Sequence, residues 1–112
     1  MAKEKKSYDL VLSLTEKVAK DEMMGVVERA AAATGLYISH IGQYSRLKYP
    51  NSVHWHFKRD KKEPGLIDAT FWQEGMRLWL IVRNSEPQWV HDTAPLLQEA
   101  LKRELASLTE QS

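Results

Sequence analysis

The chain has 112 residues, of which 43% are hydrophobic and 28% charged, a balance typical of one soluble globular domain. Sixteen basic and 15 acidic residues give a net charge of +1, which argues against a dedicated binder of polyanions. The absence of cysteine excludes a disulfide scaffold, a zinc ribbon and a thiol enzyme. No apolar run approaches the roughly 20 residues of a membrane span, and the basic opening is not typical of a secretory signal, so we expect a cytoplasmic protein without a membrane segment.

The two ends of the chain differ from its centre in polarity and charge. Residues 1–6 are polar and are expected to form a disordered tail, which leaves a single domain over residues 7–112. Residues 36–84 carry eight basic and four acidic groups, whereas residues 85–112 carry two and five. The middle of the chain is therefore mildly basic and its C-terminal segment acidic.

A helical pattern occupies the first third of the domain. Ser13 and Glu16 have the spacing of a capping box, apolar residues then recur at helical intervals, and Gly35 follows as a stop signal. The pattern predicts a helix over about 14–34. Polar and apolar residues alternate over residues 8–14, so a short strand is the alternative there.

Four short segments rich in β-branched and aromatic residues follow, and turn residues separate them. They predict a four-strand antiparallel meander over residues 36–44, 53–58, 66–72 and 77–83. Gly42 in the first segment suggests a bulge. A last helix is predicted over 93–109, where Asp92 or Thr93 caps the helix and Pro95 is tolerated in its first turn. The order α-β-β-β-β-α is an α+β fold, with the N- and C-terminal helices expected on one face of the sheet.

Alternation along the last three strands sorts their side chains onto two faces. The apolar face, expected to pack on the helices, carries Val53, Trp55, Phe57, Ile67, Ala69, Phe71, Leu78, Leu80 and Val82. The other, which we call the open face, carries His54, His56, Lys58, Asp68, Thr70, Trp72, Arg77, Trp79, Ile81 and Arg83. Hairpin symmetry predicts the pairs across this face: His56 with Asp68, His54 with Thr70, Trp72 with Arg77, and Thr70 with Trp79.

The composition of the open face indicates an interaction surface. A plain solvent face would be built from Thr, Lys, Glu and Ser, yet this one holds Trp72, Trp79 and Ile81. Clustered apolar residues on a nominally exposed face mark an interface, and Trp and Arg are enriched at binding hot spots. We expect a small binding or adaptor module that acts through this face as a homodimer, rather than an enzyme, and we expect no cofactor.

Two alternatives stay open. In one, Trp72 and Trp79 stack on single-stranded nucleic acid while Lys58, Arg77 and Arg83 lie near its phosphates.

In the other alternative, the motif His-Trp-His carries chemistry. His54 and His56 project from one side of a strand, roughly 6.6 Å apart. With Asp68 they form a candidate two-His, one-carboxylate metal site of a small hydrolase, and His56 with Asp68 is a candidate acid–base pair. His40 joins them only if the first strand runs in the matching register.

Overall fold

A five-stranded antiparallel sheet and two helices make up the fold. The computed structural model describes residues 6–42 and 48–110. In chain order the elements are β1 (Ser7–Ser13), α1 (Lys20–Ala33), β2 (Tyr37–Gly42), β3 (Val53–Lys58), β4 (Ile67–Trp72), β5 (Arg77–Arg83) and α2 (Gln88–Glu110). The strands lie in the order β1-β5-β4-β3-β2, so the predicted meander is present and β1 adds a fifth strand beside its end.

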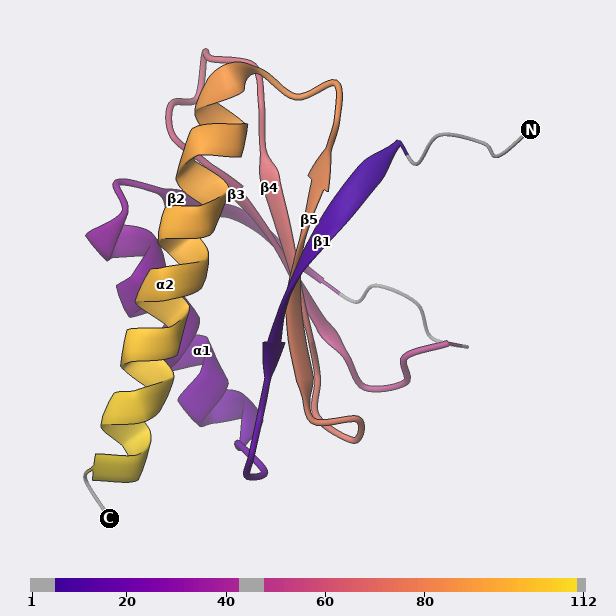
Figure 1. The fold of residues 1–112 in the computed structure, drawn as a ribbon, viewed down its shortest axis with the longest axis vertical. Coiled ribbons are helices and arrows are strands. Elements are labelled where there is room, and N and C mark those ends of the chain that lie inside the picture. Colours follow the sequence, from indigo (N-terminus) through magenta and orange to yellow (C-terminus); the bar gives the residue numbers. More distant parts are fainter. Residues whose placement is uncertain (1–5, 43–47, 111–112) are drawn as a thin grey trace.

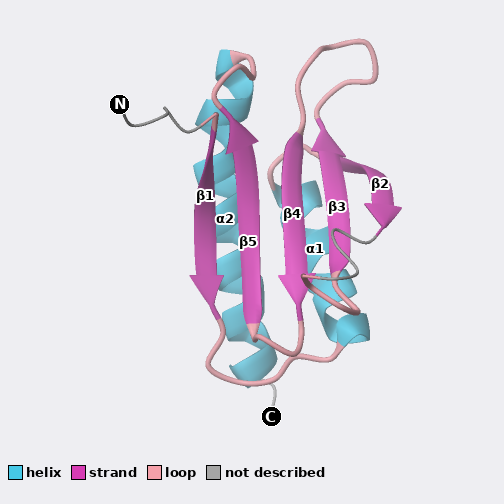
Figure 2. Cartoon of the chain, turned by 90° about the vertical axis from the view of Figure 1, so that its right-hand side faces the viewer, coloured by secondary structure: helices cyan, strands magenta, loops and turns pink. Residues whose placement is uncertain are grey.

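Both helices pack on the same face of the sheet (Figure 1), which confirms the predicted α+β layer arrangement. Seen from the other side, α2 lies behind β1 and β5 and α1 lies behind β3 and β4 (Figure 2). None of the helices that the structure describes lies on the opposite face. Within the described part of the chain, neither helix is long and apolar enough to cross a membrane.

Strand β1 occupies a segment for which the sequence offered two interpretations, the start of a helix near residue 14 and a short strand over residues 8–14. Tyr8, Leu10 and Leu12 pair with Val82, Leu80 and Leu78 and so continue the apolar face across β5. The predicted helix start at residue 14 is therefore wrong. The helix begins at Lys20, and it is Glu22, not Glu16, whose carboxylate accepts a hydrogen bond from the N-cap nitrogen, that of Ala19. The segment forms a strand because the edge of β5 offers it both backbone hydrogen-bond partners and apolar neighbours. Of the predicted tail, residues 1–5 lie outside the described residues.

Helix α2 also begins elsewhere than predicted, at Gln88 instead of residue 93, and Pro95 lies inside it. The added turn is anchored by Trp89, whose indole Nε1 donates a hydrogen bond to the Pro64 carbonyl at 2.9 Å. Gly65 makes that contact possible, because a Cβ on it would lie 2.8 Å from the same indole nitrogen. Its φ of +111° also favours glycine.

The core lies between the helices and the predicted apolar face. Eight of the nine residues assigned to that face are buried, and only Val53 is partly exposed. Trp55 and Phe57 are fully buried, as are Met23 and Val27 on the facing side of α1. Because burial of such side chains is the main favourable term in folding, this layer holds the sheet and fixes which side chains face away from the helices.

Candidate functional site

The open face has the cross-strand pairs that hairpin symmetry predicted. His54 pairs with Thr70 and His56 with Asp68 between β3 and β4, and Thr70 pairs with Trp79 between β4 and β5. The fourth predicted pair, Trp72 with Arg77, is also present. All ten residues assigned to this face therefore lie opposite the helices, and four of them are buried although no helix covers them: His54, Asp68, Thr70 and Trp79.

A turn of the same chain explains the burial of Trp79. The ring of Tyr49 lies 5.1 Å from the Trp79 ring and 5.2 Å from the Trp72 ring, centroid to centroid. Trp79 is consequently only 4% exposed. We call Trp72, Trp79 and Arg77 the aromatic half of the open face. The sequence pattern predicted that a second copy or another partner would cover these tryptophans, and Tyr49 of the same chain was not singled out.

The turn that holds Tyr49 in place has recognisable chemistry. The Ser52 nitrogen donates a hydrogen bond to the Tyr49 carbonyl at 3.2 Å, and the two central residues are Pro50 and Asn51. Asn51 has a φ of +63°. Proline followed by a residue with positive φ is the pattern of a type II turn. The Tyr-Pro-Asn signal just before β3 thus predicts the turn itself, although not the surface on which the Tyr49 ring lies.

Cation and backbone contacts complete the aromatic half. The Arg77 guanidinium lies over the Trp79 ring, 5.0 Å from its centroid. Trp72, by contrast, lies against the β4–β5 hairpin, since a Cβ on Gly75 would fall 2.2 Å from its ring. The expected proximity of Arg77 and Trp72 as strand partners is correct, but the cation–π contact that the structure describes for Arg77 is with Trp79.

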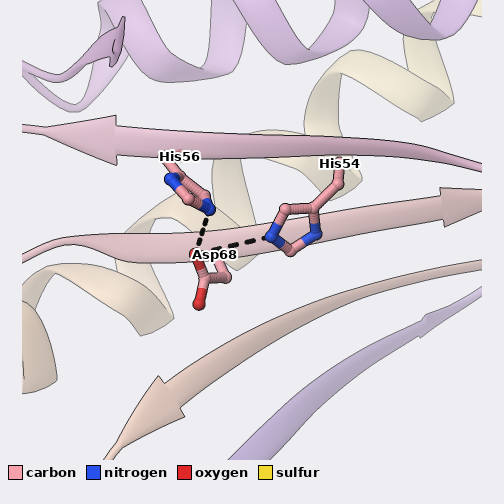
Figure 3. A group of neighbouring side chains, drawn as sticks. All are labelled: His54, His56 and Asp68. Atoms are coloured by element: carbon pink, nitrogen blue, oxygen red, sulfur yellow. Dashed lines mark ion pairs between the residues drawn. The ribbon is translucent and has the colours of Figure 1, made fainter. Parts of the chain in front are cut away.

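The second part of the open face, which we call the histidine half, consists of His40, His54, His56, Asp68 and Ile81. Two imidazole Nε2 atoms converge on one carboxylate oxygen (Figure 3). Nε2 of His56 lies 3.1 Å from Asp68 Oδ1, and Nε2 of His54 lies 3.6 Å from it. Among the described residues, no group is aligned to hydrogen bond to that buried oxygen, even though the closer imidazole is within ion-pair distance.

A further contact orients His54. Its Nδ1 and the Thr70 hydroxyl are 2.6 Å apart, and Thr70 is fully buried. With Nδ1 occupied in this way, Nε2 is the ring nitrogen directed at Asp68. The side chains of His54 and Asp68 are 11% and 12% exposed, whereas that of His56 is 34% exposed. The group is therefore reached from solvent past His56.

A bulge brings His40 to the same face. Ile38 pairs with Phe57 on the helix side, the register then shifts by one residue, and His40 pairs with His56. Without the extra residue His40 would have pointed toward the helices, since side chains alternate along a strand. The bulge was expected at Gly42 and instead lies at Ser39, whose hydroxyl donates to the His56 carbonyl at 3.2 Å. The His40 and His56 rings lie 5.2 Å apart.

The surroundings of His56 favour its neutral form. Burial lowers the pKa of His56 below its ordinary value of 6.5, because the charged imidazolium is poorly solvated there. The Asp68 carboxylate opposes this shift, whereas His54, His40 and Arg83 reinforce it. A neutral imidazole can accept a proton or coordinate a metal ion, so His56 retains both abilities near neutral pH.

The basic hairpin tip between β3 and β4 is tied to the rest of the molecule. Arg59 is paired with Glu63 four residues later, and its guanidinium lies 4.8 Å from the centroid of the Trp89 ring on α2. These contacts give Arg59 a role within the fold.

The chain matches no protein-family model, and neither a curated protein nor a solved structure is significantly similar to it.

Proposed function

We propose that this protein is a cytoplasmic binding module whose open face associates with a second copy of the chain. The observation that carries the proposal is that apolar side chains remain exposed in the histidine half and beside it. Val11 on β1, the strand partner of Trp79, is 43% exposed, and Ile81 on β5 is only partly buried. Contiguous apolar side chains on a face without helices are typical of an interaction surface.

The charges around these residues suit a self-complementary contact. Asp9 pairs with Ile81 and is exposed, and Arg83 lies two residues further along β5 and is exposed as well. In a two-fold dimer each patch meets its own copy, so a face that carries both signs of charge can form ion pairs with itself. A face with one sign would repel its copy.

The size of the sheet limits the strength of the contact. Five strands of six or seven residues form a face of roughly 20 Å by 20 Å, and Tyr49 already covers part of it. A standard interface buries about 800 Å² on each partner. We therefore expect a weak, concentration-dependent dimer and not an obligate one.

Sedimentation velocity tests this proposal, with protein at about 1 μM to about 1 mM. The wild type is expected to shift from monomer toward dimer, and Ile81→Lys to stay monomeric over the whole range because it places a charge in the contact. Leu96→Lys is the matched control, since Leu96 is 60% exposed on α2, away from the open face. A wild type that remains monomeric throughout, or two variants that behave alike, would contradict the proposal.

Binding of single-stranded nucleic acid has less support from the same face. A base stacks on an exposed aromatic ring, whereas Trp79 is 4% exposed beneath Tyr49. The open face therefore offers protein contacts more readily than stacking contacts.

A further inference from the structure

The histidine half brings together three side-chain atoms that could bind one metal ion. One nitrogen each from His54 and His56 and one oxygen of Asp68 all lie within 4.8 Å of one another. A metal with bonds of about 2.1 Å at near-tetrahedral angles holds neighbouring ligand atoms about 3.4 Å apart. The two nitrogen–oxygen distances, 3.1 and 3.6 Å, lie on either side of that value.

Two independent observations distinguish this group from a chance cluster of polar residues. The first is Asp68 Oδ1, a buried carboxylate oxygen with no hydrogen bond among the described residues, in a residue that is 8% exposed. Such an oxygen is costly unless a cation or a donor compensates it. The second is the contact of Thr70 with Nδ1 of His54, which fixes the ring as the outer contacts of metal-bound histidines do.

We propose that His54, His56 and Asp68 bind one divalent transition-metal ion. Two imidazoles and one carboxylate favour Zn²⁺ and its first-row neighbours over Mg²⁺ and Ca²⁺, which prefer all-oxygen ligands. Three protein ligands leave at least one coordination position on the exposed side of His56. The proposal concerns metal binding alone and does not depend on the dimer.

Metal titration of untagged protein tests the proposal, because a histidine tag would itself bind the metal. Zn²⁺ added to EDTA-treated, dialysed protein is followed by calorimetry, and Co²⁺ by its visible absorption. We expect one ion per chain and a higher melting temperature in its presence, because a ligand that binds the folded state stabilises it. No binding of either ion by the wild type would overturn the proposal.

Three variants locate the ion. His56→Gln and Asp68→Asn each remove one ligand with little change in volume and should weaken Zn²⁺ binding by at least about 100-fold. His91→Gln is the control, because His91 lies on α2 and contacts Tyr8 and the Glu86 carbonyl, away from this group. Melting curves in EDTA establish that each variant is folded. Equal loss of Zn²⁺ affinity in His56→Gln and His91→Gln would overturn the assignment. The sedimentation runs described above contain EDTA, so dimer formation is measured without metal. A failure of the dimer proposal is then distinguished from a failure of the metal site.

Discussion

The aromatic and histidine halves of the open face have the same origin in the sequence and different fates in the structure. Both consist of large or ionisable side chains on strand positions that point away from the helices. In the aromatic half, Tyr49 covers Trp72 and Trp79, and Trp79 is as buried as a core residue. In the histidine half, Asp68 is buried without a hydrogen bond to its Oδ1 within the described chain, and the neighbouring His56 stays accessible.

The fold explains the burial of one half and not of the other. The fold itself accounts for the tryptophans, since they pack against a turn of their own chain and against a glycine hairpin. It does not account for two imidazoles directed at one carboxylate oxygen, because burial of these groups opposes folding unless something compensates them. Substitutions in the aromatic half should therefore act on stability, and substitutions in the histidine half on binding.

The largest expected effect is that of Trp79→Ala. Truncation of a buried tryptophan leaves a cavity and removes its contacts with Tyr49 and Arg77, so the free energy of unfolding should fall by about 3 kcal/mol or more. Urea denaturation measures it. His56→Ala in the histidine half should cost much less, because that side chain is partly exposed. Equal losses of stability in the two variants would remove the distinction between the halves.

An intermediate effect is expected for Tyr49→Ala. Each aromatic contact contributes about 0.5–1.5 kcal/mol beyond the buried area, so the loss of two should lower the free energy of unfolding by about 1–3 kcal/mol. The variant should also expose Trp79, which acrylamide quenching of tryptophan fluorescence detects. Tyr49→Phe keeps the ring and should keep the protection. Unchanged quenching in Tyr49→Ala would show that the turn does not shield the tryptophans in solution.

The smallest expected effect is a pH dependence in the histidine half. Burial lowers the folded-state pKa of His56, with Asp68 on β4 opposing and His54, His40 and Arg83 reinforcing the shift. The unfolded chain then binds more protons between the folded value and 6.5, so stability is complete above pH 6.5 and falls as the pH drops through the folded-state pKa.

Proton NMR of the imidazole in EDTA measures this directly. The midpoint of the His56 titration should lie below 6.5, and His56→Gln should reduce the acid sensitivity of the urea transition. A midpoint at or above 6.5 would mean that the Asp68 carboxylate outweighs burial.

Sequence patterns located most of the sheet and its faces. Strands β3 and β5 have the predicted bounds, and the cross-strand pairs of His54 and His56 follow from the centre of the β3–β4 hairpin. Period-two alternation is a strong signal when one face is buried, because a slip of one residue would exchange the faces. The start of α1 was missed because Ser13 and Glu16 imitate a helix cap, whereas pairing with β5 decides the conformation of Ser13.

The position of Tyr49 over the tryptophans and the bulge in β2 both depend on contacts between segments that are distant in the sequence. Tyr49 reaches Trp79 across 30 positions of sequence, and the Tyr-Pro-Asn signal predicts a turn but not the surface on which it lies. The bulge at Ser39 has no glycine or proline to mark it, and it alone decides that His40 shares a face with His56.

The same bulge has a consequence for solubility. Strand β2 forms one border of the sheet, and a regular border strand offers a free row of backbone donors and acceptors to any other extended chain. The extra residue at Ser39 breaks the spacing of that row, so a sixth strand cannot continue the ladder without a matching irregularity of its own. The bulge that brings His40 to the open face therefore also makes the β2 border a poorer template for an added strand.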